Sequence, residues 1–415
     1  MTKHVVVIGA GIVGLCAAHY CRQRGWDVTV VERNGERRDG CSFGNAGMIV
    51  PSHFVPLAAP GAVALALRWM SNPASPFYVK PRASWDLVAW GLRFWRAANS
   101  AHVARAAPVL RDLNLASRDA HEALARALGL DVARTGTLML CKTRHALAEE
   151  ARTAALAQRL GIAAEVLDAQ QTAALEPSVR MDVIGSAFFP GDAHVDPERL
   201  VNALQQDLAR RGTRFVWNAE VSEFVREGAR IRAIRVGAED IAADDVVLAA
   251  GSWSAKLARM CGLTVPLQPG KGYSLTLREP RALPQRAAIL TEARVAVSAM
   301  GSTLRFGGTM ELAGFDDSIN PMRVRSIVAA ASRYYPDFES ADFDAVQAWR
   351  GFRPCSPDGV PYLGRSAQCP NLVVATGHAM MGVSLAPITG SLVSQVIAGE
   401  PPDIDIALLS PDRYH

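Results

Sequence analysis

The chain has 415 residues, of which 49% are hydrophobic and 20% are charged. This composition is typical of a folded globular protein, and the length exceeds one ordinary hydrophobic core, so we expect two domains. The 44 basic and 40 acidic residues leave a formal net charge of +4 without a long basic run, which argues against a nucleic-acid-binding protein. The seven cysteines are odd in number, scattered and without a C-x-x-C pair. We therefore expect no metal site, no disulfide framework, and a reducing cytoplasmic compartment.

The N-terminal residues predict a strand, a turn, a helix and a second strand. Residues 5–8 read Val-Val-Val-Ile, an apolar run typical of a strand that is buried on both faces. A helix is expected over 12–24, where Gly25 ends it, and a second strand over 27–32. This order is the βαβ opening of a parallel sheet. Glycines interrupt the apolar run at the positions of a nucleotide-binding turn, so we do not interpret it as a signal peptide.

The rest of the chain alternates helical and strand patterns. We expect a loop over 33–56, mostly helices over 59–128 and 145–159, a strand over 134–141, a helix over 197–211, apolar strands over 246–250 and 371–375, antiparallel strands within 267–277 and 293–308, and a final helix over 382–398. Nucleotide-domain patterns therefore stand at the start, middle and end of the chain. We predict an α/β fold, α+β overall, with a discontinuous Rossmann-type domain of residues 1–58, 143–266 and 345–415. Residues 59–142 and 267–344 are expected to form an antiparallel-sheet substrate domain.

The strongest local motif is the segment 9–14, Gly-Ala-Gly-Ile-Val-Gly, between the first strand and the first helix. Gly9 allows a tight turn, Gly11 lets the backbone approach a pyrophosphate, and Gly14 lets the helix pack on the sheet. The N-terminus of the helix offers free N–H groups to the phosphates. Glu32 stands at the end of the second expected strand, where its carboxylate can accept both ribose hydroxyls of an adenosine. These features predict a bound dinucleotide, and the motif alone does not distinguish FAD from NAD.

Three later segments carry a resemblance to a known family. Residues 41–47 read Cys-Ser-Phe-Gly-Asn-Ala-Gly, residues 249–253 read Ala-Ala-Gly-Ser-Trp, and residues 376–382 read Thr-Gly-His-Ala-Met-Met-Gly. Together with the glycine turn they resemble, in the same order, the flavin-contacting motifs of the D-amino-acid oxidase family, over nearly the whole chain. The resemblance implies FAD as the cofactor. It places the first segment under the pyrophosphate and the last against the N1–C2=O edge of the flavin, where helix N–H groups stabilise negative charge.

The dinucleotide motif and this resemblance together assign contacts to FAD. The assigned residues are Gly9, Gly11, Ile12, Val13, Gly14, Glu32, Arg33, Ser42, Asn45, Ala46, Gly47, Val221, Ala250, Gly251, Trp253, Gly377, Gly382, Val383 and Ser384.

The substrate side is expected from the segments 271–275, 305–311 and 351–359. The last resembles the Gly-x-Arg-Pro segment of the family, which implies that Arg353 holds the substrate carboxylate, with Tyr273 as a second, phenolic donor. These two are our candidate catalytic residues. The substrate pocket is expected to include Met48, His53, Met310, His378 and Met381. Since flavin amine oxidation needs no dedicated protein base, we expect His378 to make a structural or flavin-edge hydrogen bond.

Within the family, the segments 271–275, 304–315 and 351–359 resemble bacterial D-amino-acid dehydrogenases rather than eukaryotic oxidases. The implied reaction is oxidation of a D-amino acid to an imino acid, and then to a 2-oxo acid. Hydride would pass from Cα to flavin N5, and the electrons to a quinone or other respiratory acceptor. The loop 378–386 is bulkier and more apolar than in the alanine-type members, which argues against D-alanine as the preferred substrate. The chain also resembles some bacterial proteins that act on cis-4-hydroxy-D-proline, which makes that compound or D-proline a candidate substrate. An O₂-using oxidase of a D-amino acid, glycine or sarcosine, and a flavoprotein subunit of a larger complex, remain alternatives.

A tryptophan-rich segment bears on partners. Trp69, Trp85, Trp90 and Trp95 lie close together in the sequence, with lysine and arginine residues among them. Aromatic and basic residues together suit a peripheral contact at the inner face of the cell membrane. A helical core wall or a subunit contact in an oligomer is the alternative. The sequence has no uncharged apolar run of the length that a membrane-spanning helix needs, so no helix is expected to span a membrane.

Overall fold

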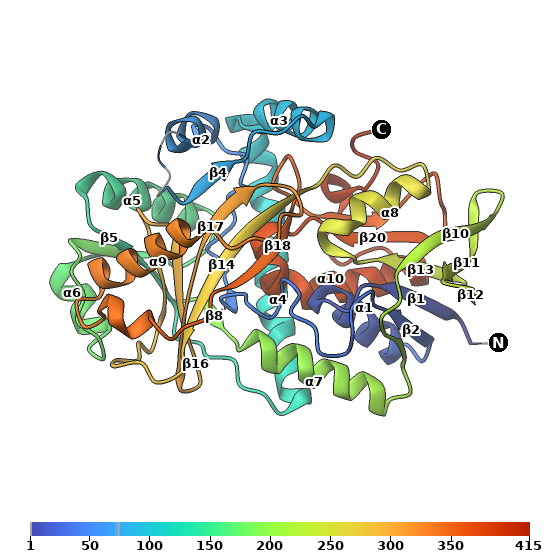
Figure 1. The fold of residues 1–415 in the computed structure, drawn as a ribbon, viewed down its shortest axis with the longest axis horizontal. Coiled ribbons are helices and arrows are strands. Elements are labelled where there is room, and N and C mark those ends of the chain that lie inside the picture. The colour runs from blue at the N-terminus through green and yellow to red at the C-terminus, as the bar shows by residue number, and fades with distance from the viewer. Residues whose placement is uncertain (1, 71, 73–74) are drawn as a thin grey trace.

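A computed structural model describes residues 2–70, 72 and 75–415. The chain forms two large sheets that lie side by side, each accompanied by its own helices (Figure 1). One sheet begins with the N-terminal strand, and the other is built mainly from the second half of the chain.

The first sheet is the predicted nucleotide-binding sheet. Its strands run in the order β19 (Tyr362–Arg365), β20 (Leu372–Thr376), β13 (Asp245–Leu248), β1 (His4–Ile8), β2 (Asp27–Val31) and β9 (Arg214–Val216). All neighbours pair in parallel except β19, which is antiparallel at the edge. The three apolar strands expected from the sequence are β1, β13 and β20, and they lie next to one another because each is buried on both faces.

Helices cover this sheet. They are α1 (Ile12–Gln23), α7 (Pro197–Arg210), α8 (Ser254–Met260), α10 (Gly382–Ala398) and the long α4 (Ser100–Leu128). Helix α1 packs closely on α10, since a side chain at Gly390 would come within 2.5 Å of the backbone of Cys16. The segment Ala379–Ala398 is long and apolar enough to cross a membrane, but 67% of it is buried inside the fold, as in a core helix.

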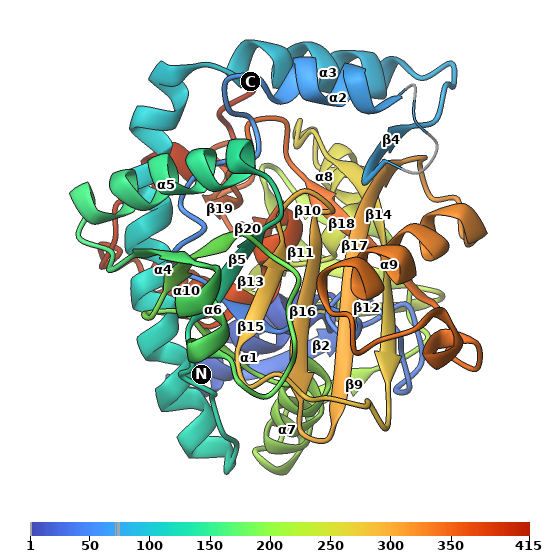
Figure 2. The same cartoon turned by 90° about the vertical axis from the view of Figure 1, so that its left-hand side faces the viewer.

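The second sheet is large and mixed. Its strands run in the order β18 (Trp349–Cys355), β14 (Gln268–Leu277), β17 (Thr303–Leu312), β16 (Val295–Met300), β15 (Ala287–Leu290), β5 (Thr137–Cys141), β7 (Gly185–Phe189) and β6 (Glu165–Asp168), with β4 (Phe77–Val79) beside β17. Most neighbours are antiparallel, as expected, but β5 and β4 pair in parallel with β15 and β17. Helices α5 (Arg144–Arg159), α6 (Ala169–Leu175) and α9 (Pro321–Tyr334) accompany it (Figure 2).

Two smaller sheets complete the fold. Strands β10 (Val221–Glu227), β11 (Arg230–Val236) and β12 (Glu239–Ala242) form an antiparallel meander beside the first sheet. Strands β3 (Met48–Ile49) and β8 (Ala193–His194) form a short antiparallel pair. This pair joins the loop after β2 to the end of the second sheet.

Strand pairing shifts the expected domain boundaries at two places. Strands β6 and β7 lie within the predicted nucleotide segment 143–266, but they pair with β5 in the large sheet. Helix α4 was expected in the substrate domain, but it packs on α10, where Ser117 Oγ donates to the carbonyl of Ser384 at 2.6 Å. The division at these places was wrong because local alternation predicts a strand without showing which distant sheet it joins.

The tryptophan-rich segment forms an outer layer of two helices, α2 (Ala62–Met70) and α3 (Trp85–Ala97), along the top of Figures 1 and 2. No residue of α2 is buried, and in α3 only Trp90 is. The Trp90 indole N–H donates to the carbonyl of Cys355 at 2.9 Å and anchors the helix. Trp85 and Trp95 are 87% and 64% exposed, so the core-wall alternative is wrong.

Candidate active site

A cavity opens at the carboxyl ends of β1, β2 and β13, where ligands of open parallel sheets bind. It continues from the glycine turn past residues 40–45 to the start of α10. The predicted cofactor residues that line it are Gly9, Gly11, Ile12, Val13, Glu32, Arg33, Ser42, Asn45, Val221, Ala250, Gly251, Trp253, Gly382 and Val383.

The glycine turn has the shape that a pyrophosphate requires. Gly9 has φ +107°, and an added Cβ would lie 2.5 Å from the carbonyl oxygen of Ala249. At Gly14 an added Cβ would lie 1.9 Å from the carbonyl oxygen of Gly9, so the helix packs directly on the turn. Gly11 has only Ser42 Oγ nearby, at 3.6 Å, and therefore presents open backbone to the cavity. The Ser42 hydroxyl accepts the Ile12 N–H at 3.0 Å, at the N-terminus of α1.

Glu32 occupies the position expected for a ribose-binding carboxylate. It is 8% exposed, and it lies at the end of β2 in the cavity wall. Its two oxygens accept the N–H groups of Ala10 and Asn34, both at 2.9 Å. The carboxylate is thus held at the rim of the glycine turn and keeps further lone pairs for a ligand.

We expect Glu32→Ala to bind FAD about tenfold to 100-fold more weakly. Hydrogen bonds to a charged group contribute about 1.5–3 kcal/mol, and each 1.4 kcal/mol is about tenfold in affinity. Titrating the apoprotein with FAD and following the quenching of flavin fluorescence measures the change. The spectrum of any flavin that is bound should stay as in the wild type, and an unaltered affinity would remove Glu32 from the site.

Arg38 is a cavity residue that our sequence analysis missed. Its Nε donates to the carbonyl of Ala10 at 3.0 Å, and its guanidinium lies over the rings of Phe43 and Trp217. Its Nη2 is buried without a partner among the described residues, and burial lowers the pKa of the side chain. An unpaired cationic donor beside the glycine turn fits the charge of a dinucleotide pyrophosphate. The available signal was a basic residue shortly after Glu32, in a loop expected to approach the cofactor.

Other lining residues were not assigned individually, although most of them lie in the predicted segments 41–47, 351–359 and 376–382. They include Asn34, Phe43, Lys256, Phe352, Pro354, Thr376 and Ala379. Lys256 in α8 and Asn34 after β2 lie outside those segments, and their approach to the cavity depends on tertiary packing.

The turn between β20 and α10 closes the far end of the cavity. Gly377 has φ +81° and packs on the ring of Tyr362, and Ala379 also has a positive φ, +46°. The turn directs the N-terminus of α10, where helical N–H groups lack partners, toward the cavity. His378 lines the cavity, and burial lowers its pKa to about 4. Its ring is hydrogen-bonded to Thr389 at 3.0 Å, so it is a neutral, structurally held side chain.

Five predicted cofactor residues do not line the cavity in the part of the chain that the structure describes. They are Gly14, Ala46, Gly47, Gly377 and Ser384. Gly47, at φ +69°, packs on the carbonyl of Val195, and Ser384 Oγ accepts the Val50 N–H at 3.1 Å. These residues shape the cavity from behind its wall.

Arg353 lies on the glycine-rich face of the large sheet. It pairs with Gly270 across β14 and β18, and its guanidinium covers Gly272, where an added Cβ would lie 2.2 Å from Nη1. Nη1 donates to the carbonyl of Thr309 at 2.5 Å. Burial raises the pKa of Cys41, which lines the cavity, while the charge of Arg353 opposes the rise. The guanidinium therefore stands beside the loop that would pass under the flavin.

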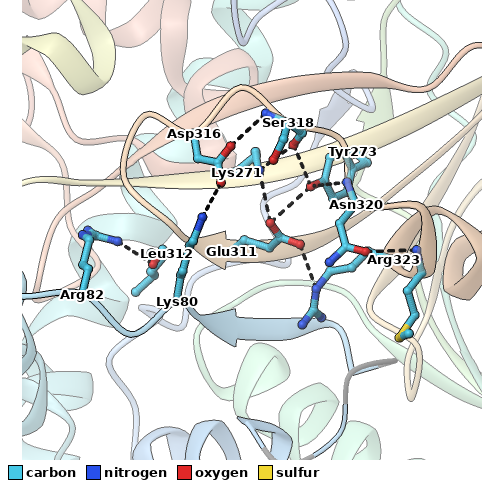
Figure 3. Close-up of polar contacts among 11 residues, drawn as sticks. Lys80, Arg82, Lys271, Tyr273, Glu311, Leu312, Asp316, Ser318, Asn320 and Arg323 are labelled. Carbon is cyan, nitrogen blue, oxygen red and sulfur yellow. Dashed lines mark hydrogen bonds and ion pairs between the residues drawn. The ribbon is translucent and has the colours of Figure 1, made fainter.

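Tyr273 does not accompany Arg353. Its hydroxyl donates to Glu311 Oε2 at 3.2 Å and accepts the N–H of Asn320 at 3.2 Å (Figure 3). Side chains alternate along a strand, so Tyr273 and Gly272 face opposite sides of β14. The prediction that Tyr273 contacts the substrate carboxylate conflicts with this placement. The sequence indicates the alternation, but not which face meets the cavity.

The predicted pocket residues separate into different environments. Met48 is buried in a cluster that also contacts Met381, and Met310 is buried with Trp90 and Cys355 beneath α3. The structure therefore does not bring these methionines into one lining.

His53 belongs to neither of the two clusters that contain these methionines. Its Nδ1 is hydrogen-bonded to Ser52 Oγ at 3.0 Å, and Ser52 also bonds to buried Asp192. Burial and the charge of Arg294 lower the pKa of His53 to about 4. Of the five predicted pocket residues, His378 lines the described cavity.

Comparisons with known proteins agree with this architecture. A family described as FAD dependent oxidoreductase matches residues 4–396. A D-amino acid dehydrogenase of Granulibacter bethesdensis is 32% identical over 422 residues, covering 99% of both chains. One of Methylobacterium nodulans is 34% identical over 420 residues, again with 99% of each chain covered.

Solved structures share the fold. Glycine oxidase from Geobacillus kaustophilus superposes with a TM-score of 0.80 at 23% identity and covers 100% of both chains. L-proline dehydrogenase from P. horikoshii has a TM-score of 0.75 at 18% identity, covering 100% of this chain and 98% of its own. The family match over residues 4–396, the two dehydrogenase relatives and the dinucleotide cavity lead to one conclusion. The chain belongs to the D-amino-acid oxidase family of FAD-dependent oxidoreductases.

Proposed function

We propose that this protein is an FAD-dependent dehydrogenase of D-amino acids that forms an imino acid and passes the electrons to a quinone or another respiratory acceptor. The observation that supports it best is Arg353, held on a glycine-rich face beside the FAD cavity. The two relatives at 32% and 34% identity are D-amino acid dehydrogenases, which supports the same substrate class.

The side chains around Arg353 suit the binding of a small carboxylate. One N–H of the guanidinium is engaged by the Thr309 carbonyl, and the fork retains further N–H donors for a carboxylate. Gly272 carries no side chain, so the guanidinium lies directly against β14, while Cys355 Sγ occupies the space over Gly270 and the Trp349 ring that over Gly351. Bound FAD supplies the two-electron acceptor. His378 is neutral and bonded within the chain, so we assign it no proton transfer.

For the side-chain preference we propose a cyclic substrate, D-proline or cis-4-hydroxy-D-proline. Fewer residues of the loop 378–386 support this preference in the structure than the sequence indicated. Leu385 is 1% exposed within α10, and Met380 is 45% exposed, so neither shapes the site as a pocket wall. Val383 remains as an apolar lining residue at the flavin end of the cavity, and Met381 packs behind it on the cluster of Met48. An apolar wall favours a cyclic substrate over D-alanine because a ring buries more apolar surface against it than a single methyl group does.

Anaerobic bleaching of the flavin tests the function directly. The holoenzyme is mixed with D- and L-amino acids, glycine, sarcosine, D-proline and cis-4-hydroxy-D-proline, and the loss of flavin absorbance is followed. We expect bleaching with D-amino acids and the fastest with the cyclic ones. Transfer to a quinone analogue without peroxide supports the dehydrogenase, whereas stoichiometric peroxide in air would favour the oxidase alternative. No bleaching by any of these compounds would favour the electron-transfer subunit.

We further propose that α2 and α3 contact an anionic membrane, with the protein peripheral on the cytoplasmic side. Trp85, Val88, Leu92 and Trp95 are 87%, 50%, 53% and 64% exposed, and their spacing places them along one helix face. Residues 62–97 contain five lysines or arginines and one aspartate, so the layer is basic as well as apolar. An exposed apolar stripe with flanking cations suits an anionic lipid surface.

Vesicle sedimentation tests this contact. We expect the wild type to pellet with vesicles of phosphatidylglycerol and phosphatidylcholine and to remain soluble with phosphatidylcholine alone. Trp85→Ser with Trp95→Ser should lower binding by about tenfold or more, because each tryptophan withdraws about 150–250 Å² from water. Val166→Ser with Ile184→Ser, which removes exposed apolar groups from the large sheet, is the control and should bind normally. A wild type that stays in the supernatant with anionic vesicles contradicts the proposal, and a change in molecular mass in the tryptophan variant would indicate a subunit contact.

A further inference from the structure

Thr309 has an unusual backbone for its residue type. It lies in β17 at φ +63°, a left-handed conformation that β-branched residues adopt rarely and at a cost. The pairing of β14 with β17 explains where it sits. Lys271 pairs with Glu311 and Tyr273 with Gly308, so an advance of two residues along β14 corresponds to three residues along β17. The extra residue makes a β-bulge whose left-handed position is ordinarily occupied by glycine.

The bulge directs the Thr309 carbonyl at the proposed carboxylate clamp. This oxygen accepts the Arg353 Nη1–H at 2.5 Å, from a guanidinium that already lies against Gly272. In an unbulged strand this carbonyl would instead be directed toward a neighbouring strand of the sheet. The strained conformation therefore orients Arg353.

The side chain of Thr309 is equally distinctive. The residue is 7% exposed, and its hydroxyl is buried without a hydrogen-bond partner among the residues that the structure describes. A buried hydroxyl without a partner is costly, and groups of this kind occur where a ligand supplies the bond. The carbonyl of the same residue accepts from Arg353, so this unpartnered hydroxyl belongs to a residue in direct contact with the proposed clamp.

From these observations we infer that Thr309 is a positioning and substrate-contacting residue: its carbonyl orients Arg353, and its hydroxyl donates to the substrate carboxylate. The inference rests on the proposed function in that Arg353 is taken as the carboxylate clamp. Strain at a site persists when it serves binding, so a replacement that relieves it should stabilise the protein while weakening the site.

Three substitutions of Thr309 separate the hydroxyl from the strain. Thr309→Val keeps the shape without the hydroxyl, Thr309→Ser keeps the hydroxyl, and Thr309→Gly adopts the left-handed conformation without penalty. The holoenzyme is titrated with benzoate, a carboxylate without an α-amine, by calorimetry, and the thermal midpoint is recorded. We expect Val and Gly to raise the Kd for benzoate about tenfold, the loss of one hydrogen bond to a charged group, and Ser to remain within about threefold. We expect Gly to raise the midpoint by about 1–3 °C.

A matched control shows whether any buried threonine would behave in this way. Thr213 is also 7% exposed and its hydroxyl likewise has no partner among the described residues, but it follows α7 at an ordinary φ, away from Arg353. Thr213→Val should leave the Kd for benzoate unchanged. Wild-type affinity in both Thr309→Val and Thr309→Gly would overturn the inference, as would a wild type that binds no benzoate.

The benzoate titration also distinguishes this inference from the proposed function. Benzoate binding needs no turnover, so a holoenzyme that binds benzoate through Thr309 but is bleached by no amino acid would refute the function and retain the carboxylate site. In an active enzyme, Thr309→Val should lower kcat/KM by about tenfold, mainly through KM, because the hydroxyl contacts the substrate carboxylate equally in the ground and transition states.

Discussion

Replacing Arg353 with alanine should lower kcat/KM for D-amino acids by about 30-fold or more. Truncating one partner of a buried charge pair typically costs about 2–5 kcal/mol, and each 1.4 kcal/mol is about tenfold in rate. In this structure the Arg353 guanidinium lies against Gly272 and donates to the carbonyl of Thr309, beside the cavity-lining residues Phe352 and Pro354. Steady-state kinetics with a D-amino acid and an artificial electron acceptor measure the loss.

Two further variants test whether the loss comes from the guanidinium fork or only from the removal of a charge on this strand. Arg353→Lys should recover only part of the loss, because an ammonium cannot make the two parallel bonds of a guanidinium fork. Arg350→Ala removes the same charge from the same strand, where Arg350 is paired with Asp39 and Asp317 at the surface, and it should stay within about threefold of the wild type, as expected for exposed ion pairs. FAD content should be normal in all three. Near-normal kcat/KM in Arg353→Ala would refute the clamp and weaken the amino-acid assignment.

Replacing Glu311 with alanine should destabilise the fold by about 3–5 kcal/mol, since removing one partner leaves buried charges uncompensated. Glu311 lies between two cations in the interior of the large sheet, at 3.3 Å from Lys271 Nζ and 2.8 Å from Arg323 Nε (Figure 3). The side chains are 5%, 1% and 2% exposed, respectively. Without the carboxylate, Lys271 keeps the carbonyl of Ser318 and Arg323 that of Ser75, and both charges stay buried.

The network also holds a loop, which makes the loss visible beyond stability. Lys271 and Tyr273 bond to residues 318 and 320 in the segment between β17 and α9, and Phe315 of that segment stacks on the cavity residue Trp253. We expect the thermal midpoint of Glu311→Ala to fall by about 5–10 °C, with increased proteolysis within 313–320.

The matched control for this prediction is Glu223→Ala. Glu223 pairs with Arg235 at the surface of the meander, where an exposed pair contributes about 0–1 kcal/mol, so the midpoint should change by at most about 2 °C. Both variants are compared with the wild type by calorimetry at saturating FAD. Equal midpoints in Glu311→Ala and the wild type would show that the buried cations find other compensation.

Features that depend on neighbouring residues could be predicted from the sequence. The turn at 9–14 was predicted from three glycines, and in the structure a Cβ at Gly9 or Gly14 would collide with backbone while Gly11 leaves its backbone open. The role of Glu32 was predicted from its position at the end of the next strand. The apolar strands β1, β13 and β20 and the helix Gly382–Ala398 were predicted with nearly the observed bounds, because burial on both faces leaves no polar residue inside a strand. These local patterns were sufficient to predict a dinucleotide-binding fold, and the family resemblance of the later motifs specified FAD.

Features that depend on which distant segments meet were decided by the tertiary structure alone. The pattern of a strand does not show which strand it pairs with. Strands β6 and β7 pair within the large sheet, contrary to the predicted domain division. Alternation does not show which face meets the cavity, so Tyr273 points to Glu311 while Arg353 stands on the opposite side. The bulge at Thr309 exists only in the pairing of β17 with β14, and the exposure of α3 only in its packing. Each outcome is a contact between residues far apart in the chain, and local propensity carries no information about such contacts.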